Sequence, residues 1–336
     1  MMKNATVKAA AVQAAPVYLD LSATIEKTVS LIKAAAEKGC NLIVFPETWL
    51  PGYPWFIWIN HTAHNMKYFG AYHQNSLVFD SDEFNAIGRA AKENNIFVSL
   101  GASERDHGSL YIAQFLFGSD GSTLAKRRKL KPTHQERSLF GEGSGSDIQV
   151  CDTDIGRVGQ LSCWENMQPL VKQAMYSFHE QIHCAAWPSF SVMTEQSYAL
   201  GPDFNLAVSQ MYAAEGQCFV VAACNLVSDE MMDMLVEADH HNELMKAGGG
   251  HSAIFGPDGR PIGNRLKENE EGLVIAELNM EDITYSKLFL DPVGHYSRPD
   301  IVRLLLNTES QSVTQNLVEA EEETAEEDDS LDQTGL

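Results

Sequence analysis

A cysteine stands where an apolar run ends, in the stretch "GQLSCWENMQ" at residues 159–168. Taken alone, Cys163 fits an inert buried thiol better than a nucleophile, because a free cysteine usually behaves as a small hydrophobic side chain. A reactive cysteine needs a neighbouring base or cation that favours its thiolate. Trp164, Glu165 and Asn166 directly follow, and this polar company makes Cys163 the first candidate for a nucleophile.

Two carboxylates and a lysine elsewhere in the sequence could supply that base and cation. Glu47 follows the apolar run "NLIVF" and a proline, so we expect it at the carboxyl edge of a sheet, where open α/β sheets place their sites. An ordinary strand-end acid fits this stretch equally well. Lys129 lies in the basic stretch "AKRRKLK", most of which we expect to be solvated, although strand alternation would turn one or two side chains inward. Glu136 lies beyond Pro132 and could return to meet Lys129.

Buried strands and amphipathic helices must position these residues. Strands joined both by helices and by hairpins indicate an α/β or α+β layered fold, and no Pro/Ser-rich linker divides the chain. We predict strands at 7–14, 41–47, 96–104, 182–190 and 218–225, helices at 19–39, 82–94, 167–181 and 202–217, and hairpins within 105–130, 147–164 and 252–263.

Other cysteines and histidines fit structural positions. Cys184, Cys218 and Cys224 lie in strand-like runs, so we expect them in the core. The stretch "DHHNE" at 239–243 could bind a metal, but without a partner cluster it fits an exposed loop better.

The motifs "FPETWLPGYPW", "RRKLKPTHQER", "CWEN", "WPSFS" and "DPVGHYSRPD" resemble, in order and spacing, the nitrilase branch of the nitrilase superfamily. The resemblance runs from about residue 7 to 306. It implies a four-layer αββα sandwich. It also implies that Glu47, Lys129 and Cys163 form a Glu-Lys-Cys triad, with Glu136 as an assisting glutamate. The substrate-binding candidates that it implies are Tyr53, Trp55, Trp164, Trp187 and Ser189.

The implied reaction is hydrolysis of an organic nitrile, arylaliphatic or aromatic, to the carboxylic acid and ammonia through a thioimidate and a thioester on cysteine. It requires no metal and no organic cofactor. Many similar nitrilases carry His after "CWE". This chain has Asn166 there, and an asparagine at that position also resembles the cyanide-hydrating branch. Cyanide hydration or dihydration and amide hydrolysis therefore stay open as alternatives, as does a non-catalytic, filament-forming relative.

Composition narrows the partners and the location. The 336 residues carry a net charge of −22, and nine of the 46 acidic residues fall between Glu319 and Asp332. We therefore expect a catalytic domain at 1–310, a disordered acidic tail at 311–336, and no nucleic-acid or membrane binding. Six cysteines without CxxC spacing, and no export signal, fit the cytoplasm. The resemblance adds a homodimer that associates into a larger spiral oligomer.

Overall fold

The computed structural model describes residues 6–238 and 240–310, and within them twelve strands join in one hydrogen-bonded sheet. The strand order is β5-β4-β3-β2-β1-β9-β8-β7-β6, with β12 paired to β1 and β10 to β9. The strands are β1 (Thr6–Ala14), β2 (Leu42–Val44), β3 (Phe97–Asp106), β4 (Ser109–Phe117), β5 (Thr123–Arg128), β6 (Val150–Thr153), β7 (Gly156–Ser162), β8 (Ile182–Trp187), β9 (Phe219–Asn225), β10 (Ala253–Phe255), β11 (Pro261–Ile262) and β12 (Gly272–Asn279).

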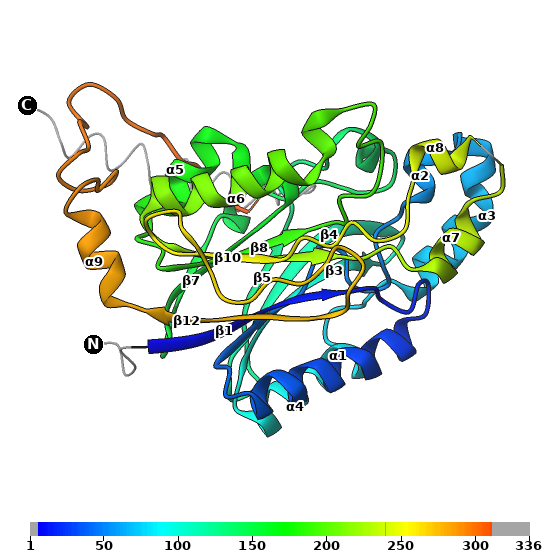
Figure 1. Ribbon diagram of the computed structural model, residues 1–336, viewed down its shortest axis with the longest axis horizontal. Coiled ribbons are helices and arrows are strands. Elements are labelled where there is room, and N and C mark those ends of the chain that lie inside the picture. The colour runs from blue at the N-terminus through cyan, green and yellow to red at the C-terminus, as the bar shows by residue number, and fades with distance from the viewer. Residues whose placement is uncertain (1–5, 239, 311–336) are drawn as a thin grey trace, which may run out of the picture.

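Helices cover both outer faces of the strands, with α1 and α4 on one side and α5 and α6 on the other (Figure 1). The helices are α1 (Leu21–Glu37), α2 (Phe56–Ile59), α3 (Thr62–Asn75), α4 (Asp82–Asn94), α5 (Pro169–Ser177), α6 (Pro202–Gly216), α7 (Asp229–Leu235), α8 (His241–Leu244) and α9 (Glu281–Lys287). Short 3-10 helices are η1 (His134–Ser138), η2 (Gly145–Asp147), η3 (Cys163–Met167) and η4 (Tyr198–Leu200).

The four layers follow from the alternation of side chains along buried strands. In β1, Ala10 and Val12 pack in the core beneath α1 and α4, while Ala9 and Ala11 pack in a second core shared with strands β7, β8 and β9. A third core, which includes Tyr212, lies under α5 and α6. Three cores between successive layers make the protein an αββα sandwich, as the resemblance implied.

Parallel pairing determines where functional side chains can meet. β1 pairs in parallel with β2 on one side and, through Gln13 and Ala14, with β9 on the other. β7, β8 and β9 are also mutually parallel. The carboxyl ends of these strands therefore lie together where the two halves of the sandwich join, which is the expected place for a site.

Most predicted elements are confirmed, and several others were not predicted. Strands β1, β8 and β9, the helix over Asp82–Asn94 and the three hairpin regions are where the sequence placed them. The sequence did not predict α3, which buries only Tyr68 and Tyr72, so its pattern of apolar residues is weak. It also missed β12 and the short helices α2, α7, α8 and α9.

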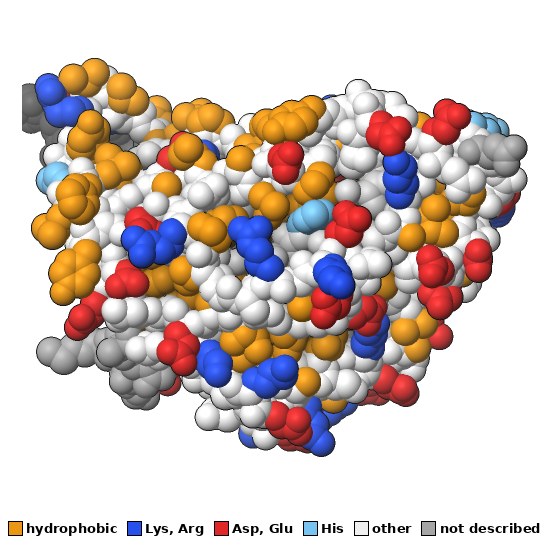
Figure 2. Space-filling model, in the orientation of Figure 1, with side chains coloured by type: hydrophobic (Ala, Val, Ile, Leu, Met, Phe, Trp, Pro, Cys, Tyr) orange, Lys and Arg blue, Asp and Glu red, His pale blue; other side chains and the backbone are white. Residues whose placement is uncertain are grey.

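Exposed apolar side chains gather over α9 and the segment that follows it, at the left of Figure 2. The exposed apolar residues of these two segments include Tyr285, Leu288, Phe289, Tyr296, Ile301, Val302 and Leu305.

None of the helices within 6–238 and 240–310 has the length and apolar character that crossing a membrane requires. The predicted acidic tail at 311–336 lies outside the described residues, and that division of the chain stays a prediction.

Candidate active site

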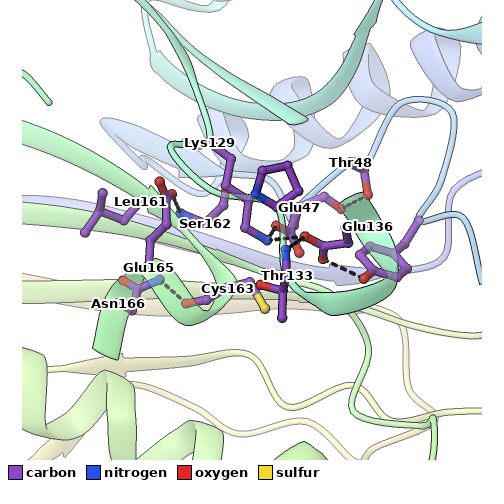
Figure 3. A network of polar contacts seen from close by, with 12 residues as sticks. Glu47, Thr48, Lys129, Thr133, Glu136, Leu161, Ser162, Cys163, Glu165 and Asn166 are labelled. Atoms are coloured by element: carbon purple, nitrogen blue, oxygen red, sulfur yellow. Dashed lines mark hydrogen bonds and ion pairs between the residues drawn. The ribbon is translucent and has the colours of Figure 1, made fainter. Parts of the chain in front are cut away.

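The ends of three strands bring the predicted residues together (Figure 3). Cys163 directly follows β7, Lys129 directly follows β5, and Glu47 lies three residues beyond β2. Glu136 comes from η1, where its side chain accepts a hydrogen bond of 2.6 Å from the backbone N–H of Thr133. The turns after β2, β5 and β7, together with η1, therefore bring all four side chains to one place.

Lys129 connects the two carboxylates. Its Nζ donates to Glu47 Oε1 at 2.8 Å and to Glu136 Oε2 at 2.8 Å, and at most 1% of each of the three residues is exposed. Cys163 Sγ and one carboxylate oxygen of each glutamate all lie within 4.8 Å of one another. One ammonium thus joins two carboxylates beside a thiol, and all four side chains are buried.

The backbone at the site adopts conformations that side chains other than glycine rarely take. Thr48, His134 and Cys163 have φ values of 45°, 44° and 51°. Such left-handed residues cost about 1–3 kcal/mol each and persist where surrounding structure holds them. The strain therefore coincides with the turns that carry Glu47, Glu136 and the thiol.

Burial and neighbouring charges shift the ionisation of the site. Burial raises the pKa of Glu47 to about 8, with Glu136 contributing and Lys129 opposing. Burial, and then the charge of Glu47, raises the pKa of the Cys163 thiol well above its ordinary value. Burial alone would lower the pKa of Lys129, but Glu136 and Glu47 outweigh it and hold that pKa well above its usual range. At rest, the thiol is therefore protonated and the ammonium charged.

Glu47 keeps one oxygen free within the part of the chain that the structure describes. Its Oε1 accepts from Lys129, whereas its buried Oε2 has no hydrogen-bond partner there. Its backbone is fixed, since its N–H donates to Trp187 O at 3.3 Å and its carbonyl accepts from Asn225 Nδ2 at 2.7 Å. A carboxylate with a free oxygen near a thiol can act as a general base.

Gly101 on β3 allows the strand to pass close to the turn that carries Glu47. A Cβ at this position would lie 2.0 Å from the carbonyl oxygen of Pro46 and 3.1 Å from Glu47 Cα. Sequence reasoning did not single out this glycine, because only the three-dimensional approach of β3 to the turn requires it.

An apolar pocket opens onto Cys163, and all five predicted substrate-binding residues line it. Tyr53 also donates from its hydroxyl to Glu136 Oε1 at 2.6 Å, so it joins the polar network. The hydroxyl of Ser189 does not join this network, since it donates to Gly248 O at 2.8 Å. The predicted lining residues are Tyr53, Trp55, Trp164, Trp187 and Ser189, and the sequence missed Trp58, Thr133, Pro188, Phe190, Val192, Leu200 and Asn205.

Arg127 and Glu165 form a second buried ion pair beside the site. Arg127, which is 1% exposed, donates to Glu165 Oε1 at 2.7 Å, and Glu165 also accepts from the backbone of Leu130 and Ser162. The expectation that one or two bases of the basic stretch turn inward is therefore confirmed by Arg127 and Lys129. Their spacing of two along an extended chain could have identified the pair.

Two further expectations have clear outcomes. The cysteines at 184, 218 and 224 are fully buried, which confirms their place in the core.

The stretch at 239–243 was expected to be an exposed loop, but His241 is 3% exposed within α8, so that prediction is wrong there. The buried Nδ1 of His241 accepts from the backbone of Glu237, an interaction that spacing alone does not predict.

Lys129 also bears on metal binding. Glu47, Glu136 and Cys163 have the ligand types and spacing to hold a metal ion. The ammonium of Lys129 lies 2.8 Å from both carboxylates, so it supplies the positive charge that an ion would bring. The two carboxylates are therefore already neutralised in part by the Lys129 ammonium, and this arrangement fits them better than a bound metal ion.

Comparisons with known proteins find a matching family, similar sequences and a similar fold. Residues 8–287 match the carbon-nitrogen hydrolase family. A nitrilase of Pseudomonas syringae is 53% identical over 89% of this chain and 89% of its own. An arylacetone-specific nitrilase of Alcaligenes faecalis is 52% identical over 91% and 86%, and an aliphatic nitrilase of Rhodococcus rhodochrous is 48% identical over 90% and 83%. The crystal structure of the C. elegans NitFhit protein has the same fold, with a TM-score of 0.70 at 20% identity over 92% of this chain and 69% of that one.

Proposed function

Because the chain belongs to the carbon-nitrogen hydrolase family and is a nitrile-hydrolysing enzyme, we propose that it converts an organic nitrile to a carboxylic acid and ammonia through a covalent intermediate on Cys163. One observation carries the proposal: Lys129 bridges Glu47 and Glu136, and each of these glutamates has a carboxylate oxygen within 4.8 Å of the Cys163 sulfur. A base, a cation and a nucleophile in one buried site are what addition to a weak electrophile requires.

In the first half-reaction, the free Oε2 of Glu47 takes the proton of the Cys163 thiol. The thiolate sulfur attacks the nitrile carbon, a carbon–sulfur bond forms, and one π bond to nitrogen breaks. The nitrogen takes the proton from Glu47 and becomes a thioimidate. Lys129 stabilises the negative charge that develops on nitrogen, in the manner of an oxyanion hole.

In the second half-reaction, Glu47 takes a proton from water, which adds to the thioimidate carbon. Glu47 returns that proton to nitrogen, and the hydroxyl proton of the tetrahedral intermediate then passes to nitrogen through Glu47. The carbon–nitrogen bond breaks, ammonia leaves, and a thioester to Cys163 remains. A second water, activated in the same way, releases the acid and restores the thiol. Glu136 holds Lys129 in place from the opposite side throughout.

The pocket supports an arylaliphatic or aromatic substrate. Trp58, Trp164, Trp187 and Phe190 offer flat apolar walls beside Cys163, and such walls suit a ring. The relative from Alcaligenes faecalis is named for an aryl substrate and the relative from Rhodococcus rhodochrous for aliphatic ones, so the substrate class needs a direct comparison.

Formation of ammonia and of amide from phenylacetonitrile, benzonitrile, an aliphatic dinitrile and cyanide, and of ammonia from phenylacetamide, provides that comparison. We expect the highest kcat/KM for an aryl nitrile, with acid as the main product. A higher kcat/KM for cyanide than for every organic nitrile would instead support a cyanide hydratase or dihydratase. A preference for the amide would support an amidase, and no turnover of any compound would support a non-catalytic relative.

The proposal extends to assembly and location. The apolar residues exposed over α9 and beyond, such as Phe289 and Leu305, support a homodimer that grows into a larger spiral oligomer. Light scattering after size exclusion should show at least a dimer, and a monomer would contradict this. All six cysteines are free, which fits the reducing cytoplasm. We propose no partner beyond the nitrile and copies of the chain, and neither a nucleic acid nor a membrane.

A further inference from the structure

Four buried polar side chains, none of which lines the pocket, form a hydrogen-bonded chain that ends on the backbone of Cys163. Asn166 Nδ2 donates to the carbonyl oxygen of Cys163 at 2.8 Å, and Asn166 Oδ1 lies 2.7 Å from His183 Nε2. His183 Nδ1 lies 2.7 Å from Glu180 Oε1, and the Tyr212 hydroxyl donates to Glu180 Oε2 at 2.7 Å. None of Asn166, Glu180, His183 and Tyr212 is more than 3% exposed, and none lines the pocket.

The hydrogen bonds determine where the protons lie. A backbone carbonyl can only accept, so the amide nitrogen of Asn166 must face Cys163 and its oxygen must face His183. His183 Nε2 therefore carries a hydrogen. One further proton lies between His183 Nδ1 and Glu180, which makes that pair neutral overall. The ring of His183 also stacks on that of Tyr212, with centroids 3.8 Å apart, so its plane is fixed.

Fixing the Cys163 carbonyl also fixes the neighbouring N–H group. The carbonyl of Cys163 and the N–H of Trp164 belong to one planar trans peptide unit and point in opposite directions. The backbone of Trp164 partly offsets the burial that raises the pKa of the Cys163 thiol, so its N–H favours the thiolate. A residue at φ 51° needs such anchoring, because its backbone would otherwise relax toward a more common conformation.

We propose that Asn166, His183, Glu180 and Tyr212 form a positioning relay that aims the Trp164 N–H at the reacting sulfur and at the anion that forms beside it. The relay residues touch neither substrate nor reacting atoms. They act through the peptide unit that joins Cys163 to Trp164. The relay spans three elements, since Asn166 lies in η3, His183 on β8 and Tyr212 on α6.

Stability alone is a weak reason for burying these groups. Removing a charged or polar pair from water costs free energy that its attraction only partly returns, and apolar side chains of similar volume often serve stability as well. A relay that ends on the backbone of the nucleophile gives this pair a role that an apolar core could not perform. The inference rests on the proposed role of Cys163 as the nucleophile.

Two substitutions of His183 separate positioning from stability. The amide nitrogen of glutamine lies near the place of His Nε2, whereas that of asparagine lies near Nδ1. His183→Gln therefore keeps the donor to Asn166, and His183→Asn keeps only the contact with Glu180. Both variants should lower the melting temperature, but kcat of His183→Gln should exceed that of His183→Asn about fivefold or more, with KM within about twofold.

Asn166→Asp tests the same relay if the His183 variants fail to fold. It keeps the size of the side chain and an acceptor for His183, but it replaces the donor to Cys163. We expect kcat to fall about tenfold or more at nearly unchanged KM. Alkylation of Cys163 by iodoacetamide, followed by peptide mass, should require a higher pH than in the wild type. His241→Gln, which removes a buried histidine that does not line the pocket, should lower stability only.

Several outcomes would overturn the relay: equal kcat in the two His183 variants, full activity in Asn166→Asp, or an alkylation profile that does not move. These results are distinguishable from a failure of the proposed function. Activity retained in Cys163→Ala would remove the nucleophile itself, whereas an inactive Cys163→Ala beside a fully active Asn166→Asp would remove the relay alone.

Discussion

Cys163 and Cys224 make an instructive comparison, because both are buried thiols at the carboxyl ends of parallel strands that flank β8. Cys163 follows β7 and Cys224 lies near the end of β9, and both pack in the core under α5 and α6. Burial raises the pKa of both thiols, that of Cys224 to about 12. Neither position at a strand end nor burial therefore makes a thiol reactive.

The groups that face the two sulfurs differ. Cys224 Sγ donates to the carbonyl of Pro188 at 3.1 Å and contacts that of Gly249, acceptors that hold the proton on sulfur. Cys163 faces the carboxylates of Glu47 and Glu136, which Lys129 joins. A base that can take the proton and a cation that stabilises the resulting charge distinguish a nucleophile from a core residue.

Replacing each thiol by alanine should produce the largest difference in activity between the two positions. Cys163→Ala should fold normally and lose about 10⁴-fold or more in kcat, because it removes the thiol that lies beside Glu47, Glu136 and Lys129. Cys224→Ala should lose roughly 1 kcal/mol or more of stability, owing to the cavity it leaves, and keep its turnover. Ammonia release and urea denaturation of both variants measure this. Comparable activity losses in the two would contradict the comparison.

Removing the cation should make the site at Cys163 resemble that at Cys224. Lys129→Met keeps much of the side-chain volume but leaves Glu47 and Glu136 facing one another without a positive charge. We expect kcat to fall about 10³-fold, as when an oxyanion-hole donor is lost. Lys131→Met, at an exposed neighbouring lysine, is the matched control and should keep kcat. Turnover retained in Lys129→Met would show that the cation is dispensable.

Moving the base should be less severe than removing the cation. In Gly101→Ala, the new Cβ cannot coexist with the carbonyl of Pro46 at 2.0 Å, so the turn that carries Glu47 must shift. A displacement of about 1 Å can cost about 100-fold in rate. Gly70→Ala, in open space on α3, should keep kcat and slightly raise helix stability. Equal rates in the two variants would mean that the position of Glu47 is not critical.

The smallest expected effect is a shift in the pH dependence of kcat/KM. Only ionised Glu47 can take the thiol proton, so kcat/KM should rise with pH and level off above about 8, where burial places its pKa. Glu136 is a further cause of that raised pKa. In Glu136→Gln the acid limb should therefore move to lower pH, whatever the residual rate. An acid limb that stays in place or moves upward would contradict the coupling of the two carboxylates.

The sequence predicted the framework and the reacting side chains for physical reasons. Buried strands are long apolar runs, so β1, β8 and β9 were evident, and turns after such runs mark the edge where Glu47 and Cys163 lie. The relay through His183 was not predicted, because Asn166, Glu180 and Tyr212 meet only when η3, β8 and α6 pack together. Gly101 escaped notice for the same reason: its neighbour is distant in sequence.

Intact-protein and peptide mass spectrometry during turnover of a slow nitrile tests the central claim most directly. The wild type should accumulate a single covalent adduct, and digestion should place it on Cys163, with none on Cys224. Cys163→Ala, treated in the same way, should show no adduct. An adduct on any other cysteine, or on the Cys163→Ala protein, would contradict the assignment of Cys163 as the nucleophile.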